Sequence, residues 1–135
     1  MWELFSHQSD IGIRASAETI SRAFEDAGLG LTGIITDPKD VRAAQPVNIE
    51  CTGEDEEDLF FKWMSRIIYE MDIRKMLFGR YEVKIDNLIL SAIAWGEEVN
   101  AEKHTPAVEP KAVTLNQLSV RQKNGKWTVQ CVIDV

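Results

Sequence analysis

Three acidic groups fall where predicted strands begin or end, and they are the residues best suited to chemistry. Asp10 lies where a polar loop becomes a strand, and Asp134 is the penultimate residue of the chain. The terminal carboxylate of Val135 is expected directly beside the Asp134 side chain, and neighbouring anions repel each other unless positive charge lies between them. Oxygen donors suit hard cations such as calcium or magnesium better than zinc. This arrangement indicates a metal site, although acids near strand ends are common.

Motifs of the common catalytic sites are absent. The chain has no GxSxG nucleophile motif, no phosphate-binding glycine loop and no HExxH zinc motif. Its only histidines are His7 and His104, and an isolated histidine is more often a surface or hydrogen-bonding residue than a metal ligand. Cys51 and Cys131 lie in separate apolar runs without a CxxC spacing, which favours two reduced, buried thiols over a disulfide or a metal pair. Glu97 is a further acid, distant in sequence from the other three.

The strands that must position these acids have alternating patterns. Along residues 126–135, every second side chain is apolar or aromatic, which predicts a strand packed on a core along one side. Short strands are also predicted at residues 2–5 and 11–15, so that Asp10 lies at the start of the second of them. Such junctions between loop and strand are common places for functional side chains.

A first helix is predicted to begin near Ala17, with Ser16 as its capping residue. Apolar residues recur at helical spacing from there to Leu31. Gly28 and Gly30 are expected to loosen or end the helix. The pattern therefore predicts a helix with one apolar face for packing against a sheet.

A second helix is predicted to begin in the acidic run of residues 52–58. Carboxylates are favoured at a helix N-terminus by the helix dipole, and consecutive helical residues point in different directions. A solvated helix start is therefore a better interpretation of this run than a cation site. The helix continues in a wide apolar stripe that contains Phe60, Trp63 and Ile67, and such a stripe indicates burial in the core.

Predicted strands dominate the second half of the chain. Residues 80–86 and 88–99 form a predicted hairpin with its turn at Asp86–Asn87, and a polar loop covers residues 100–110. A strand from residue 111 to 120 then leads through the turn of residues 123–126 into the last strand. These elements predict an α+β fold, in which a two-layer, largely antiparallel sheet of about six or seven strands packs against two main helices.

Length and charge narrow the classes of function. The 135 residues suit a single domain over residues 1–135, and the formal net charge is −7. This acidity argues against strong direct nucleic-acid binding, because the chain repels phosphates. The first residues lack a leader pattern, and no stretch approaches the roughly 18 apolar residues that span a membrane. We therefore expect a cytoplasmic protein without membrane association. The acidic charge still allows binding of a metal cation or a basic protein.

Five short segments, in order along the chain, resemble the archease family. The segments are His-Gln-Ser-Asp-Ile-Gly-Ile (residues 7–13), Ala-Ile-Ala-Trp-Gly-Glu (92–97), Lys-His (103–104), Glu-Pro-Lys-Ala-Val-Thr (109–114) and Val-Ile-Asp-Val (132–135). Their order, their spacing and the total length agree with the family, so the resemblance covers the whole chain. Gln8 and Ser9 depart from the usual Thr-Ala, and Leu115–Asn116 departs from the usual Tyr-His. No role for an aromatic or imidazole group is therefore carried over to residues 115 and 116.

The resemblance implies an accessory protein rather than an enzyme. Archeases assist the tRNA-splicing RNA ligase, which joins tRNA halves after intron removal and also repairs RNA. They promote guanylylation of the ligase's active-site histidine and let the ligase turn over repeatedly. The family's metal site carries over to Asp10, Asp134 and Val135, with calcium as the expected cation and magnesium or manganese as alternatives. Lys111 matches a family functional position that would face the partner or a nucleotide.

Two other classes of function stay open on the residues alone. A metal-dependent hydrolase of phosphoesters would use the same carboxylates, but a recognisable nucleophile and general base pair are missing. A metal-independent chaperone or nucleic-acid adaptor is disfavoured by the acidic charge. Turnover of nucleotides or phosphoesters without a ligase would favour the hydrolase.

Overall fold

The computed structural model describes all 135 residues as seven strands, three α-helices and one short 3-10 helix. The strands are β1 (Trp2–His7), β2 (Asp10–Ala17), β3 (Gln45–Thr52), β4 (Met76–Asp86), β5 (Ile89–Glu98), β6 (Ala112–Lys123) and β7 (Lys126–Asp134). The helices are α1 (Ile20–Ile35), α2 (Glu56–Arg74), the short α3 (Ala101–His104) and the 3-10 helix η1 (Pro38–Asp40). None of the helices is long and apolar enough to span a membrane.

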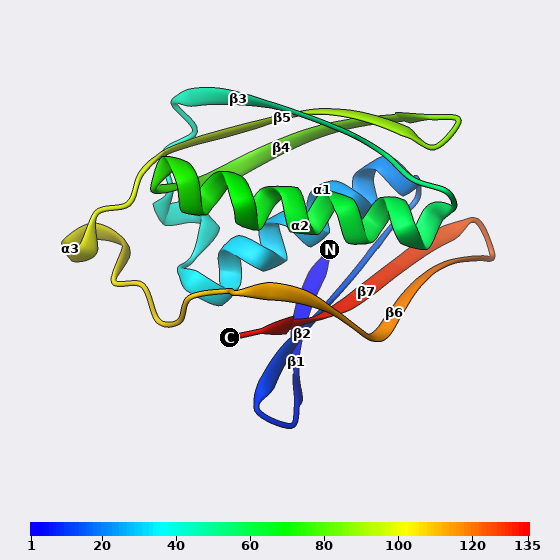
Figure 1. Ribbon diagram of the computed structural model, residues 1–135, viewed down its shortest axis with the longest axis horizontal. Coiled ribbons are helices and arrows are strands. Elements are labelled where there is room, and N and C mark those ends of the chain that lie inside the picture. Colours follow the sequence, from blue (N-terminus) through cyan, green and yellow to red (C-terminus); the bar gives the residue numbers. More distant parts are fainter.

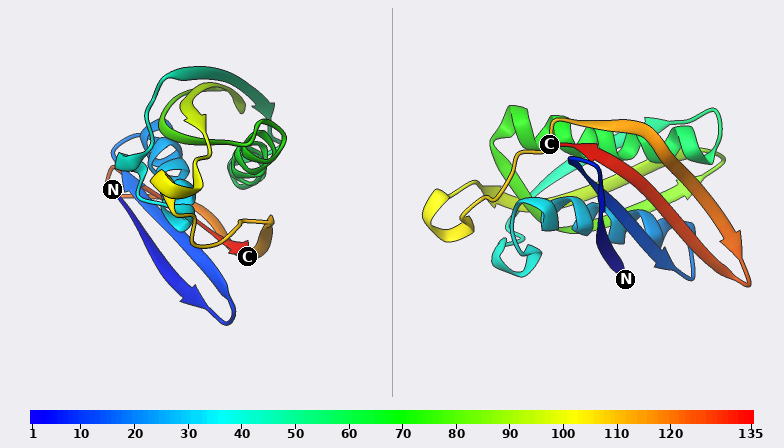
Figure 2. Two further views of the ribbon diagram at one scale, coloured as in Figure 1. Left: turned by 90° about the vertical axis from the view of Figure 1, so that its left-hand side faces the viewer. Right: turned by 90° about the horizontal axis from the view of Figure 1, so that it is seen from below.

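The strands form two antiparallel sheets with the main helices between them (Figure 1). One sheet has the order β1-β2-β7-β6 and the other the order β3-β5-β4. Helix α1 packs against β2 of the first sheet and β4 of the second, and α2 lies beside α1 and reaches β6 and β3 (Figure 2). The predicted α+β class, the antiparallel strands and the two main helices are therefore confirmed, and the structure adds the division into two sheets.

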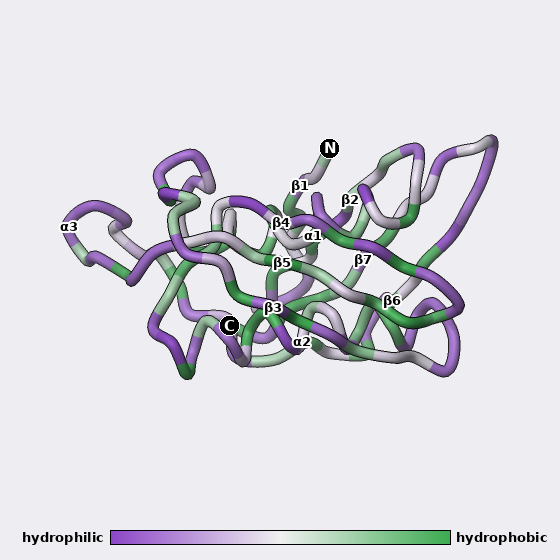
Figure 3. The backbone as a smooth tube through the Cα atoms, turned by 90° about the horizontal axis from the view of Figure 1, so that it is seen from above, coloured by the Kyte–Doolittle hydropathy of each residue, from purple (hydrophilic) through white to green (hydrophobic).

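A single apolar cluster of 29 buried residues joins the helices to both sheets. Phe60, Trp63 and Ile67 are fully buried in it, as their helical spacing predicted. The Phe24 and Phe60 rings lie 5.0 Å apart, and Nε1 of Trp63 donates to the Phe24 carbonyl at 3.0 Å. The indole N–H of Trp63, which burial would otherwise leave unpaired, thus has a partner. Figure 3 shows hydrophobic residues where the strands cross the centre of the molecule and hydrophilic residues around α3.

The first helix begins later than its sequence pattern predicted. Strand β2 continues through Ala17, which pairs with Trp127 of β7, so neither Ser16 nor Ala17 is free to start a helix. Thr19 is the capping residue instead, and its Oγ1 accepts a hydrogen bond from the Arg22 N–H at 3.1 Å. The Ser16 cap and the start at Ala17 were wrong, because sheet pairing overrides local helix signals.

The glycines of α1 do not end the helix, which continues to Ile35. A Cβ at Gly28 would lie 2.9 Å from the Tyr81 ring, and a Cβ at Gly30 would lie 2.7 Å from Ile13. Tyr81 belongs to β4 and Ile13 to β2. The glycines therefore let both sheets approach the helix closely, and the prediction that they loosen or end it was wrong.

Other differences are small. The β4–β5 turn consists of Asn87 and Leu88, which have φ angles of 50° and 62°, whereas the prediction placed it at Asp86–Asn87. The polar loop of residues 100–110 contains α3. The acidic run does form a helix start, capped by the Asp55 side chain. Both cysteines are free thiols, and Cys131 is buried as predicted, whereas Cys51 is only partly buried.

Candidate metal centre

Strand pairing brings the two aspartates to the same end of the first sheet. In the β2–β7 ladder, Ile11 pairs with Ile133. Asp10 is the first residue of β2 and Asp134 the last of β7, so each lies one residue beyond that pair. The sheet therefore places two acids from opposite ends of the chain on adjacent strand ends.

Alternation along the strands sets the direction of each side chain. Ile133 is fully buried beneath the helices, so Asp134 points to the outer face of the sheet, and Asp134 is exposed. Asp10 lies on the same outer face, in register with Gly12 and Arg14. The Val135 side chain packs against the core. This contact holds the end of the chain beside the two aspartates.

No positive group of the chain neutralises these acids. None of the ion pairs involves Asp10, Asp134 or the Val135 carboxylate. The backbone N–H of Lys111 donates to the Asp134 carbonyl at 2.8 Å, which places Lys111 beside the last strand, and the Lys111 side chain is exposed. The structure thus brings the four predicted site residues to the same end of the first sheet. These residues are Asp10, Lys111, Asp134 and Val135.

The donor set is smaller than that of a metal site built from side chains alone. Nowhere does the structure gather three or more His, Cys, Asp or Glu side chains in a way that could hold a metal ion. Asp10 and Asp134 supply two carboxylates, and the third donor would be the carboxylate of Val135. Purely anionic oxygen donors at an exposed edge fit a hard cation that retains water ligands.

His7 is a neighbour of this edge that sequence analysis set aside. It ends β1 and pairs with Asp10 across a two-residue turn of Gln8 and Ser9. Its Nδ1 atom is buried and has no hydrogen-bond partner. Buried polar atoms without partners are rare, so this atom fits a site that gains a ligand or a water. The short turn, with strand patterns on both sides, was the signal that could have placed His7 opposite Asp10.

A second polar cluster lies at the other end of the molecule. The Glu97 carboxylate accepts hydrogen bonds from the Arg42 backbone N–H at 2.8 Å, from Nζ of Lys103 at 2.7 Å and from Nε2 of His104 at 3.0 Å. These bonds, the one from the Arg42 backbone foremost, lower the pKa of Glu97 to about 2. Nδ1 of His104 accepts from the Asn100 N–H at 2.9 Å. Because Oε2 of Glu97 accepts all three bonds and both ring nitrogens of His104 are engaged, the cluster anchors α3 to β5.

Neither cysteine is suited to nucleophilic chemistry. Burial raises the pKa of the Cys131 thiol to about 12. Burial also raises the pKa of Cys51, and the positive charges of Arg66 and Lys62 offset this only in part. The thiolate is the reactive form of cysteine, so both side chains are held as inert thiols.

Comparison with known proteins identifies the family. Residues 2–135 match the Archease protein family (MTH1598/TM1083). The chain belongs to the archease family. The protein archease of Pyrococcus furiosus is 35% identical over 139 residues, which covers 99% of this chain and 98% of that one. The protein archease of Sulfolobus acidocaldarius is 34% identical over 136 residues, with the same coverage.

Solved structures agree with this archease assignment. The solution structure of Methanobacterium thermoautotrophicum protein 1598 has a TM-score of 0.88 and 30% identity, and the match covers 99% of this chain and 98% of that one. The crystal structure of a Thermotoga maritima archease, described as a possible chaperone, has a TM-score of 0.62 and 17% identity, with 97% and 94% covered. Because the identity is only 17%, this second comparison supports the fold alone.

Proposed function

We propose that this archease is a non-enzymatic activator of the tRNA-splicing RNA ligase. It promotes guanylylation of the ligase's active-site histidine and lets the ligase turn over repeatedly in tRNA splicing and RNA repair. The observation that carries the proposal is the meeting of Asp10, Asp134 and Val135 at one sheet edge in a chain of this family. The activator acts in the cytoplasm on a protein partner.

Each residue at the edge has a defined task in this proposal. Asp10 and Asp134 hold a divalent cation, calcium first and magnesium or manganese as alternatives, and the Val135 carboxylate completes the donor set. When bound, the cation supplies positive charge for anionic oxygens of a nucleotide or of the ligase active site. Lys111, exposed and free of ion pairs at the same edge, contacts a phosphate or an acidic group of the ligase.

The arrangement supports an activator better than the alternative, a metal-dependent phosphoester hydrolase. A hydrolase needs a positioned nucleophile or a base that activates water. Both cysteines are held as thiols, and His104 is committed to Glu97 and Asn100. The other histidine, His7, lies opposite Asp10, but its Nδ1 is buried. Phosphoester turnover by the isolated protein would contradict the activator.

The decisive experiment is multiple-turnover ligation of RNA ends that carry a 2′,3′-cyclic phosphate and a 5′-hydroxyl. We expect Asp10→Ala and Asp134→Ala to abolish stimulation of the ligase, because either change removes a cation ligand. Asp86→Ala is the matched control, since Asp86 is an exposed acid at the far β4–β5 turn. Lys111→Ala should impair stimulation less.

Circular dichroism of each variant distinguishes loss of function from loss of fold. The aspartates lie outside the apolar core, so all variants should remain folded. Folded aspartate variants that stimulate the ligase as well as the wild type would overturn the proposal.

A further inference from the structure

The charge of this acidic chain is unevenly distributed along the sequence. Residues 111–133 contain Lys111, Arg121, Lys123 and Lys126, and none of the chain's 22 acidic residues. The formal charge of the whole chain is −7, so four positive charges in this segment leave −11 for the rest. The β6–β7 hairpin is therefore a basic element on an acidic protein.

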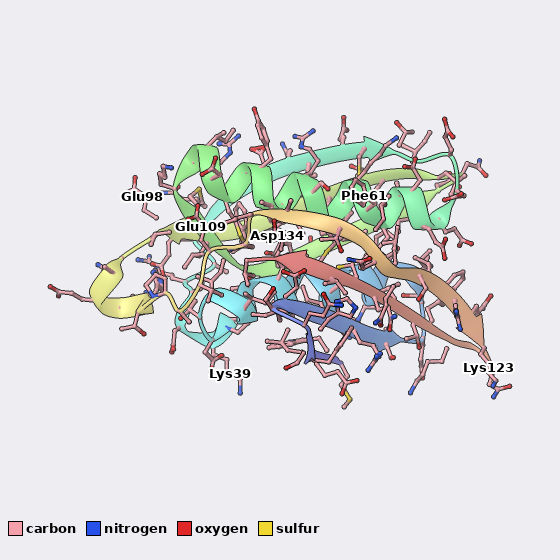
Figure 4. All side chains as sticks on the ribbon, turned by 60° about the horizontal axis from the view of Figure 1, so that its bottom comes forward. Lys39, Phe61, Glu98, Glu109, Lys123 and Asp134 are labelled. Atoms are coloured by element: carbon pink, nitrogen blue, oxygen red, sulfur yellow. The ribbon has the colours of Figure 1, made fainter.

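Three of these cations share one face at the end of the hairpin, and we call Arg121, Lys123 and Lys126 the basic strip. Arg121 pairs with Thr128 and Lys123 pairs with Lys126, so all four side chains point to the same side of the sheet. Together with Asn124 they line a shallow hollow that contains no hydrophobic residue. Figure 4 shows Lys123 at the hairpin tip, far along the sheet from Asp134.

The cations of the basic strip have no partners within the chain. All three side chains are exposed, and none takes part in an ion pair. Lys123 lies directly opposite Lys126, and like charges directly opposite on paired strands destabilise a hairpin. An anion bound between these two lysines would remove that repulsion.

We propose that the basic strip binds the phosphate backbone of RNA. Cations, a hydroxyl and an amide without apolar or aromatic neighbours suit phosphate contacts, which carry no sequence information. An acidic protein surface fits less well, because protein interfaces are centred on buried apolar or aromatic anchors. The choice of RNA as the polyanion rests on the proposed function, since the substrate of the ligase is RNA.

The basic strip and the candidate metal centre lie on one face of one sheet. Along β7, Asp134, Thr128 and Lys126 all point to the outer face, which neither main helix covers (Figure 2). Eight residues of strand separate Asp134 from Lys126, or about 26 Å at roughly 3.3 Å per residue. RNA that leaves the ligase active site near the metal centre thus meets positive charge further along the same face.

The test is binding of a fluorescent single-stranded RNA to the isolated protein, measured by anisotropy at several salt concentrations. With three phosphate contacts, we expect a slope of log affinity against log salt of about −2 and the tightest binding below about 50 mM salt. The variant Arg121→Gln/Lys123→Gln/Lys126→Gln should bind at least about tenfold more weakly at low salt. The control Lys39→Gln/Arg42→Gln/Lys84→Gln removes the same charge from exposed cations elsewhere and should keep most of the affinity.

The outcomes separate this inference from the proposed function. Two results would overturn the basic strip as an RNA site. One is an equal loss of RNA affinity in the two triple variants, and the other is no detectable RNA binding by the wild type at low salt. Tighter binding of a poly-glutamate peptide than of RNA would also overturn it. Guanylylation attaches a nucleotide to a histidine and consumes no RNA, so we expect the basic-strip variant still to promote that step, whereas Asp10→Ala should fail there and still bind RNA.

Discussion

Nε2 of His104 lies 3.0 Å from Oε2 of Glu97, and this contact joins two of the short segments by which the family resemblance was recognised. His104 is fully buried, and its Nδ1 accepts from the Asn100 N–H, so the ring proton lies on Nε2 and points at the carboxylate. Thr36 at the end of α1 donates to the His104 carbonyl at 2.7 Å. The pair therefore fixes the loop that leads toward Lys111.

Glu97→Gln should destabilise the protein at neutral pH. All three donors point at Oε2 of Glu97. A neutral amide oxygen at that place accepts hydrogen bonds more weakly than a charged oxygen, so we expect a loss of about 1–3 kcal/mol in the free energy of unfolding. Urea denaturation measures this loss. Glu98→Gln is the matched control, because Glu98 is exposed and forms no ion pair, and should change the stability little.

The difference in stability between wild type and Glu97→Gln should depend on pH. The pKa of Glu97 falls from 4.5 to about 2 on folding, so the unfolded state binds the proton more tightly. The carboxylate therefore stabilises the fold above its unfolded pKa, and this contribution is lost as pH falls from 4.5 toward 2. Urea titrations at neutral, moderately acidic and strongly acidic pH should show that the difference in free energy of unfolding between the two proteins becomes smaller as pH falls. A constant difference would contradict this account of the cluster.

Asp10→Asn and Asp134→Asn should each weaken calcium binding, because each replaces a charged oxygen ligand by a neutral one. Isothermal titration calorimetry of metal-free protein measures the change, with Asp86→Asn as the control. Without metal, either substitution removes one of three neighbouring negative charges, so stability should stay the same or rise slightly. Equal calcium affinity in all four proteins would reject the assignment.

Extending the chain beyond Val135 should also weaken calcium binding. A peptide carbonyl has no full negative charge, whereas the terminal carboxylate contributes one. Adding two glycines leaves the partly buried Val135 side chain in place, so circular dichroism and the melting temperature should be unchanged. Undiminished affinity would mean that Asp10 and Asp134 act without the chain terminus.

Phe60→Ala should destabilise the protein by about 3–5 kcal/mol, the usual range for an enclosed phenylalanine. The Phe60 ring is fully buried and packs against Phe24. Leu115→Ala is the contrasting change, because Leu115 is 75% exposed and should alter stability by less than about 0.5 kcal/mol. Similar losses in both variants would show that the apolar stripe of α2 does not hold the two sheets together.

The sequence by itself determined the elements whose signals are local. The stripe of Phe60, Trp63 and Ile67 predicted a buried helical face because side chains three and four residues apart lie together on a helix. The hairpin turn was equally readable, since Asn124 and Gly125 both adopt positive φ angles, of 55° and 73°, which these residue types tolerate best. The absence of acids between Lys111 and Ile133 was readable too, but the net charge of the whole chain concealed it.

Only the tertiary structure decided where those elements lie. Gly28 and Gly30 resemble helix breakers in sequence, but α1 passes through them because Tyr81 and Ile13 occupy the space of their missing side chains. Asp10 and Asp134 were each predicted at a strand end. That they lie close to each other depends on the pairing of β2 with β7, which comes from the opposite end of the chain. The β2–β7 pairing joins segments that lie far apart in the sequence. It is determined by the shared burial of Ile13, Cys131 and Ile133 and not by any local pattern around the acids.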